Sequence, residues 1–331
     1  GIYTAINIPY CALGGVITAD SQERVSLNSY RFFLATSAGV LVAASTLFLV
    51  KTLGQGNDQK GFQLAMAVFA TLAVAFFLVC FFLTRERVVQ ATETETSFRN
   101  DLRVLLSNDQ WVVVAIISFV VLVPLVIRGS CAIYYMTWYA GREDLISAFL
   151  TTGMIASMIG AAFASPLTKR LSTVASYASI QAVVTIASAA MFFIAPNSIT
   201  LMFVLFAVVQ FFVQMASPIL WGMMADTVDY GELKTERRIT GLVFSGGLFS
   251  LKMGMAVGGA LFGWILAYFG YLGEATTQTP EAIRGIVLLF TVIPAAGHFL
   301  LIFIVARYKL NQERCDEIRV ELDRRQASSS A

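Results

Sequence analysis

Two charged side chains lie inside long apolar stretches of this sequence. Lys252 lies in "GLVFSGGLFSLKMGMAVGGALFG" and Arg128 in "VVLVPLVIRGSCAIYY". A Lys or Arg at the centre of a membrane helix costs roughly 2.5–3.5 kcal/mol, so such a group faces water, a ligand or a partner. Both side chains donate hydrogen bonds and attract anions, which is the chemistry of binding. We therefore expect Lys252 to face a solute-sized space, whereas Arg128 also fits a side chain that extends to the nearer membrane surface.

A dense run of charges precedes the Lys252 stretch. The segment "DTVDYGELKTERR", residues 226–238, places Asp226, Asp229 and Glu232 three residues apart and ends on two arginines. This spacing puts the three carboxylates near one face of a helix. The run fits a solvated loop, and it equally fits one side of an ion-pair network whose exposed pairs would each be worth about 0–1 kcal/mol.

Catalytic chemistry is not indicated. A membrane enzyme would need an H-E-x-x-H motif, paired intramembrane aspartates or a Ser/His pair, and the apolar stretches contain none of these sets. The four cysteines have no C-x-x-C spacing, and the single His298 fits a packed side chain better than a proton relay. We expect no enzyme activity, no metal site and no cofactor, and the net charge of +2 does not suggest nucleic-acid binding.

Long apolar stretches must position these residues. Of the 331 residues, 57% are hydrophobic and 13% are charged, against roughly 45–50% and about 25% in soluble domains. A bilayer core about 30 Å thick needs about 20 apolar residues per helix. Nine stretches meet this need: 1–19, 30–51, 61–84, 111–138, 145–168, 173–195, 199–224, 241–270 and 285–307. We predict an all-α, polytopic membrane protein with nine transmembrane helices.

The distribution of Lys and Arg predicts the orientation. If the polar breaks alternate between two sides, most of these residues fall on one side, and the other side receives Lys51, Lys60, Arg142 and Arg284. Basic loops remain in the cytoplasm, so the polar connector 85–110 and the tail 309–331 should be cytoplasmic, with residue 1 outside. The tail alternates charged residues with apolar ones, which suits a solvated amphipathic helix.

Three segments carry a resemblance to a known family. They are "DTVDYGELKTERRITGLVFSGGLFSLKMG" with its D-x-x-D-Y-G-E-x-K pattern, "YTAINIPYCALGGVITADSQERVSLNSYRFF" and "AIYYMTWYAGREDL". They resemble parts of the glycoside-pentoside-hexuronide:cation symporters, the branch of the major facilitator superfamily that includes melibiose permease. These parts are the junction of the tenth and eleventh helices, the fourth helix with its following loop, and the end of the seventh helix.

The resemblance implies a domain organisation. Family members have twelve helices with both ends cytoplasmic, so the nine stretches would be helices 4–12, and the first three helices would be absent from this chain. The expected parts are a partial N-terminal bundle of helices 4–6 (1–84), a central cytoplasmic loop (85–110), a six-helix C-terminal bundle (111–308) and a cytoplasmic tail (309–331). The chain would be a monomeric, multi-pass protein of the bacterial inner membrane.

A substrate site is also implied by the resemblance. Tyr3 and Asn7 match helix-four positions of the sugar pathway, Arg31 matches a helix-five arginine, and Lys252 matches the helix-eleven lysine. Asn7 stands where melibiose permease has an aspartate, and an amide cannot supply the negative charge that attracts Na⁺. The tryptophans that stack on galactose are replaced by Cys11 and Ser217, which argues against galactoside specificity.

Two further side chains are added from the sequence itself. Gln214 lies four residues after Gln210 on one helical face and could point into the cavity. Arg128 matches no position in melibiose permease, and we hypothesise that it completes a cationic pocket with Arg31 and Lys252, suited to an anionic sugar such as a uronide.

The charged run acquires a role through the same resemblance. A set of residues matches cytoplasmic positions that pair across the two halves in the outward-facing state: Arg24, Asp226, Asp229, Glu232, Arg237 and Arg238. The implied function is symport of a sugar with Na⁺ or H⁺ by alternating access, in a lipid bilayer and without a cofactor. Two alternatives stay open, a major-facilitator transporter of a non-sugar solute and a truncated fragment that does not transport.

Overall fold

The structure, a computed structural model, describes residues 2–85 and 98–329, and these ranges contain helices and no strand. This confirms the all-α fold. The helices are α1 (Ile2–Leu13), α2 (Ser21–Gly54), α3 (Asp58–Leu83), α4 (Phe98–Ser107), α5 (Asp109–Tyr134), α6 (Ile146–Ala162), α7 (Ala164–Thr168), α8 (Thr173–Met191), α9 (Ile199–Thr235), α10 (Thr240–Tyr268), α11 (Pro280–Phe290), α12 (Val292–Val305) and α13 (Gln312–Ser329). A π-helical turn (Tyr135–Tyr139) extends α5, and a 3-10 turn (Glu143–Leu145) precedes α6.

Every expected membrane span contains a helix, and eight helical stretches of the described chain are long and apolar enough to cross a bilayer. The first expected span, 1–19, contains a helix that is too short to cross a bilayer: α1 has 12 residues and ends at Leu13. The pair Gly14 and Gly15 follows directly, and glycine disfavours continuation of a helix because its backbone loses more freedom on ordering than that of any other residue. The structure thus gives eight full spans and a shorter first helix, where the sequence predicts nine full spans.

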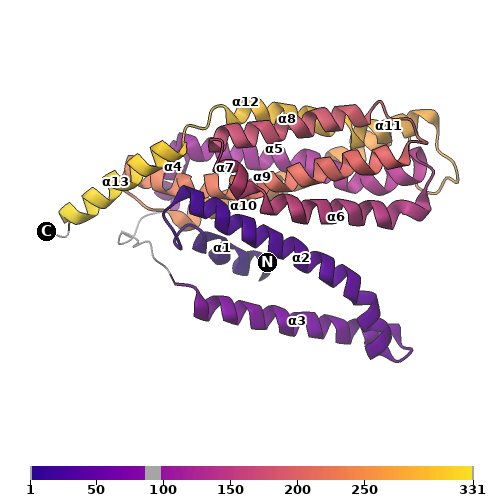
Figure 1. Cartoon of the computed structure of the whole chain (residues 1–331), viewed down its shortest axis with the longest axis horizontal. Coiled ribbons are helices and arrows are strands. Elements are labelled where there is room, and N and C mark those ends of the chain that lie inside the picture. Colours follow the sequence, from indigo (N-terminus) through magenta and orange to yellow (C-terminus); the bar gives the residue numbers. More distant parts are fainter. Residues whose placement is uncertain (1, 86–97, 330–331) are drawn as a thin grey trace.

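Helices α5 to α12 run alongside one another and form the main bundle (Figure 1). Most of the buried apolar side chains belong to these helices. Helix α2 packs along α6 and α9, whereas α3 diverges from the bundle and meets α2 near their shared turn. At that turn a Cβ on Gly61 would lie within 2.3 Å of the Val50 carbonyl oxygen, so the close approach requires glycine.

Glycines on α10 permit close packing against α5. A Cβ on Gly254 would lie 2.3 Å from the Phe119 carbonyl oxygen, and a Cβ on Gly258 would lie 2.9 Å from the Val123 carbonyl oxygen. The first G-x-x-x-G pair is therefore a helix-packing surface of the expected kind. The second pair, Gly259 and Gly263, has no atom within 4 Å of the added Cβ in the described part of the chain.

The connector 85–110, expected to be a loop, contains helical residues, and the tail, expected to be a solvated helix, is partly buried. The connector 85–110 contains α4 and the start of α5, while residues 86–97 lie outside the described ranges. Helix α13 confirms the predicted tail helix, but Leu310 and Ile318 are each only 1% exposed, because one side of the tail packs against α9 and α2. Helices α4 and α13 meet the start of α2 and the end of α9 in one region. We call this region the tail end of the bundle.

Candidate functional site

Five charged side chains from distant parts of the chain meet at the tail end and form what we call the ionic cluster: Arg24, Asp226, Asp229, Glu232 and Arg238. Helix α2 begins just before Arg24, and its N-cap residue Asp20 accepts a hydrogen bond from the Glu23 N–H. Helix α9 stays helical for 37 residues, so its three carboxylates extend from the apolar part of the same helix towards α2.

Arg24 is the centre of this cluster. Its Nη1 atom lies 2.9 Å from Asp226 Oδ1 and 2.7 Å from Asp229 Oδ2. The Ser21 hydroxyl donates to the other Asp226 oxygen at 2.6 Å. Arg238 continues the chain of ion pairs, at 2.9 Å from Asp229 and 2.5 Å from Glu232. The cluster therefore joins α2 to α9 directly.

Burial makes these pairs stronger constraints than exposed surface pairs. The side chains of Arg24 and Asp226 are each 1% exposed. A buried pair is costly to break by removing one partner, at about 3–5 kcal/mol, because the other charge is then left unpaired away from water. The expectation of weak exposed pairs is thus wrong for Arg24 and Asp226. Arg237, the sixth residue expected here, pairs instead with Asp101 of α4 at 2.5 Å.

The ionic cluster and burial together raise the pKa values of two groups on the tail. Burial raises the pKa of the Cys315 thiol, and the nearby Asp226 carboxylate raises it further. The pKa of Tyr308 is raised well above its usual value by the same two causes, and its hydroxyl donates to the Met223 carbonyl at 3.2 Å. The tail thus covers the ionic cluster with a neutral thiol and a neutral phenol.

Arg31 lies among aromatic rings further along α2. Its guanidinium carbon is 4.5 Å from the ring centroid of Trp221, 5.0 Å from that of Phe32 and 5.7 Å from that of Tyr10. Distances of this size allow cation–π attraction. Trp221 belongs to α9, so this contact is a second link between α2 and α9. At about 1.5 Å per residue, Arg31 lies about 10 Å along its helix from Arg24.

Trp221 was not anticipated from the sequence. The resemblance points to position 217, which is Ser217, and Trp221 lies one helical turn later, on a similar face of α9. The sequence did contain a usable signal, because an i, i+4 neighbour can supply a ring to the same surface. Trp221 also stacks on Phe244 of α10, with centroids 6.2 Å apart and an interplanar angle of 19°.

The other expected substrate residues are only partly brought together. Asn7 is half-buried on α1, and its Oδ1 accepts a weak bond from Cys11 Sγ at 3.7 Å. Gln214 is half-buried on α9. The side chain of Tyr3 lies outside the part of the chain that the structure describes.

Lys252 is exposed on α10. The expectation that it faces a solute-sized space stays a prediction, and the helix fixes only the side on which it lies. Two residues of an α-helix are separated by about 200°, so Lys252 points away from the Gly254 face that packs on α5.

Arg128 is buried in the bundle, 3% exposed, where it contacts α8 and α11. Its Nη2 donates to Ser188 Oγ at 2.5 Å, and its Nε donates to the Phe290 carbonyl oxygen at 3.2 Å. In a continuous helix this carbonyl would accept from residue 294, but Pro294 has no N–H. Arg128 thus satisfies a carbonyl left without its helical donor. The sequence suggests that Arg128 extends to the membrane surface or shares a pocket with Arg31 and Lys252. The contacts with Ser188 and Phe290 fit neither interpretation.

This arrangement predicts that Arg128 and Pro294 are energetically coupled. Arg128→Met leaves the Phe290 carbonyl without a donor, at a cost of about 1–3 kcal/mol, whereas Pro294→Ala supplies a helical N–H in its place. We expect Arg128→Met to lower the unfolding temperature by a few degrees more in the otherwise unchanged chain than in the Pro294→Ala background. Thermal unfolding of the four proteins measures the difference. Strictly additive effects would contradict it.

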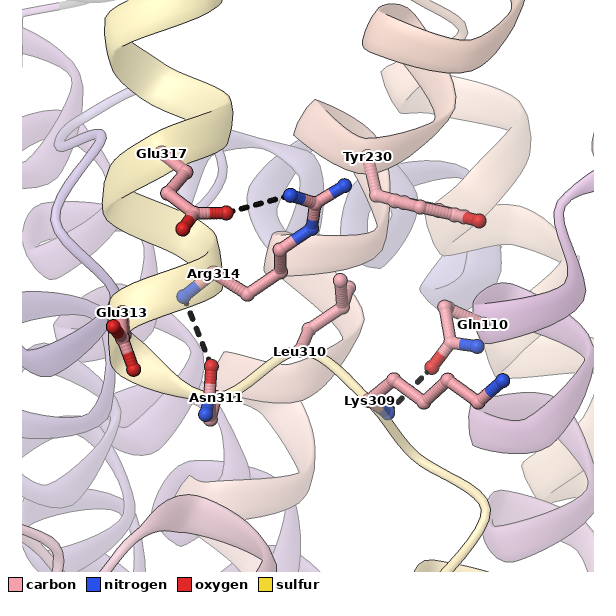
Figure 2. A pocket seen from close by; sticks show the side chains of 8 residues that line it. All are labelled: Gln110, Tyr230, Lys309, Leu310, Asn311, Glu313, Arg314 and Glu317. Atoms are coloured by element: carbon pink, nitrogen blue, oxygen red, sulfur yellow. Dashed lines mark hydrogen bonds and ion pairs between the residues drawn. The ribbon is translucent and has the colours of Figure 1, made fainter.

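A pocket of about 440 Å³ opens where the tail leaves the bundle (Figure 2). Gln110 Oε1 accepts the Lys309 N–H at 2.7 Å, and Asn311 Oδ1 accepts the Arg314 N–H at 2.9 Å. The Arg314 side chain points towards Tyr230 and is paired with Glu317 at 2.6 Å. The Gln110 contact attaches the tail to α5, and the pair with Glu317 neutralises the Arg314 charge within the tail helix itself.

Comparisons with known proteins show the family of this chain. The family described as MFS/sugar transport protein matches residues 2–312. The inner membrane symporter YicJ of Escherichia coli is 43% identical over 307 residues, which are 93% of this chain and 66% of the relative. The putative glycoside/cation symporter YagG of Escherichia coli is 36% identical over 327 residues, 99% of this chain and 71% of the relative.

A solved structure shows the same fold. The fucose:proton symporter FucP of Escherichia coli superposes with a TM-score of 0.67 over 92% of this chain and 73% of that chain, at 13% sequence identity. At this identity the likeness concerns the arrangement of helices. The chain spans about two thirds of the length of the curated relatives described above.

Proposed function

Because this chain belongs to the MFS/sugar transport protein family, we propose that it carries a glycoside, pentoside or hexuronide across a membrane together with Na⁺ or H⁺. The family consists of membrane transporters and not of enzymes. The name of the relative YagG, a putative glycoside/cation symporter, supports the substrate class, and the name of YicJ supports an inner-membrane location.

The observation that carries the mechanism is the buried ionic cluster between α2 and α9. In alternating access, two groups of helices rock about a central site and seal one side at a time. A seal must hold firmly when closed and still open during the cycle. Buried pairs between Arg24 and the carboxylates of α9 meet the first condition, and water entering between the helices meets the second by hydrating the separated charges.

We assign the tail end to the cytoplasm, as the distribution of Lys and Arg predicts. The structure then corresponds to a state that is closed on the cytoplasmic side. The proposed gate consists of the ionic cluster together with Arg237, which fastens α4 to the same end through Asp101.

The proposed substrate site lies beyond this gate, around Arg31. Its guanidinium can donate several hydrogen bonds to sugar hydroxyls or to a uronide carboxylate. Trp221 and Tyr10 supply ring surfaces against which a sugar can stack. Tyr3, Asn7, Gln214 and Lys252 are proposed as additional polar partners, while Arg128 is assigned to the structure of the bundle.

Uptake into proteoliposomes tests this proposal. We expect a labelled glycoside or uronide to accumulate when a Na⁺ or proton gradient is imposed, and to leave when an ionophore collapses that gradient. Lys252→Ala is expected to abolish accumulation while inserting normally, because removal of the charge lowers the insertion cost. Accumulation that ignores both gradients would exclude symport, and the absence of competition by any sugar would exclude the substrate class.

A further inference from the structure

A groove of about 440 Å³ lies between α2 and the α6–α7 segment, and we call it the seam groove. Gln22 of α2 joins its two sides by donating to Thr168 Oγ1 at 3.0 Å and to the Ser165 carbonyl oxygen at 3.3 Å. Helices α2 and α6 lie side by side along this seam (Figure 1). The groove is near the tail end, since Ser26 lies one helical turn after Gln22.

The lining of the seam groove changes from polar to apolar along its length. Ser29 and Ser165 are buried, at 5% and 7% exposure, and contribute hydroxyl groups. Phe33 and Leu34 form an apolar wall, and Leu34 is 63% exposed on the outer side of α2. The same outer side continues as exposed apolar residues along a helix long enough to span the membrane, so the groove opens towards lipid acyl chains.

A cation lies at the polar end of the groove. Lys169 lines it and is exposed, and Arg170 follows in sequence. Neither side chain forms an ion pair with an acidic group in the described ranges 2–85 and 98–329, although most arginines of the tail end do. Two adjacent positive charges at a membrane surface attract an anion.

We propose that the seam groove binds one anionic phospholipid, with its phosphate against Lys169 and one acyl chain along Phe33 and Leu34. A basic pocket between membrane helices near the cytoplasmic surface suits such a headgroup. A soluble anion would use the lysine but would leave the apolar wall exposed. A zwitterionic lipid would cover the wall but would bring a positive group towards Lys169 and Arg170.

Lipid titration of the purified protein in detergent tests the site. We expect phosphatidylglycerol to raise the unfolding temperature saturably, and native mass spectrometry to retain one such lipid, whereas phosphatidylcholine should do neither. Lys169→Gln should weaken the apparent affinity for phosphatidylglycerol about fivefold, as expected for loss of one surface charge. Lys51→Gln, at the other end of α2, is the matched control and should leave the affinity unchanged.

Several outcomes would overturn the proposal. Equal stabilisation by phosphatidylcholine would remove the role of charge, and equal stabilisation by inorganic phosphate would identify a free anion in place of a lipid. An equal effect of Lys51→Gln and Lys169→Gln would indicate general attraction to the basic surface. Leu34→Ser tests the apolar wall, and it should weaken phosphatidylglycerol binding without lowering the unfolding temperature of the lipid-free protein. None of these measurements depends on transport, so the site can fail while the proposed function stands.

Discussion

Substitution of Arg24 by glutamine is expected to open the tail end of the bundle. The change leaves Asp226 buried beside Asp229 without its guanidinium partner, although Arg238 still reaches Asp229. Breaking a buried pair in this way costs about 3–5 kcal/mol. The open state, in which water can hydrate both carboxylates, escapes most of this cost. The ratio of closed to open molecules should therefore fall about a hundredfold to a thousandfold.

The Cys315 thiol measures this change without an added probe site. Cys315 is half-buried, and its partial burial beside Asp226 raises the pKa of the thiol, so the thiol should react slowly with a maleimide in the closed protein. Opening exposes the thiol and lets its pKa fall, and both effects accelerate labelling. Background labelling is removed by replacing the other cysteines, Cys11, Cys80 and Cys131.

Two further variants separate a gate from general loss of stability. Arg307→Gln changes an exposed arginine of the same region and should leave the labelling rate unchanged. Exchange of the partners, Arg24→Asp with Asp226→Arg, should restore slow labelling at least in part. If Arg24→Gln labels at the rate of the unaltered chain, the ionic cluster does not hold the tail end closed.

The parts of this fold that were predictable depend on local composition. A bilayer requires about 20 apolar residues for each crossing, so the spans are visible in the sequence as long apolar stretches between polar breaks. The paired charges were partly predictable, because acidic residues three apart on one segment need basic partners. Their burial was not, since it depends on α13 returning to cover the start of α2 from nearly three hundred residues away.

The directions of side chains at the candidate site depend on more than local composition. The depth of Lys252 along its helix follows from the sequence, but its direction depends on which face of α10 packs against α5. The partners of Arg128 cannot be identified from the sequence, so its charge within an apolar stretch suggests a binding residue there. One partner is the carbonyl released by Pro294, and that contact joins residues 162 positions apart. Depth is encoded locally, whereas direction and partner choice depend on tertiary packing.

Substitution of Arg31 by glutamine is expected to lower uptake by about one to two orders of magnitude. Hydrogen bonds to a charged group contribute about 1.5–3 kcal/mol each, and glutamine retains neither the charge nor the forked geometry. Arg31→Lys should also transport poorly, because an ammonium keeps the charge but cannot stack flat on the Trp221 ring. Initial uptake rates over a range of sugar concentrations show whether KM or the maximal rate changes.

Trp221→Leu distinguishes a ring that orients Arg31 from a ring that merely fills space. A cation–π contact is worth about 0.5–1 kcal/mol when exposed and about 2 kcal/mol when shielded from water. Arg31 and Trp221 are both half-buried, so this variant should lose about threefold to thirtyfold in uptake. Because the two side chains act together, adding Trp221→Leu to Arg31→Lys should cause little further loss. Trp264→Leu removes a tryptophan that is 72% exposed on α10 and should leave uptake unchanged. Fully multiplicative losses at positions 31 and 221 would show that the ring and the guanidinium contribute independently, and would remove the basis for treating them as one binding surface.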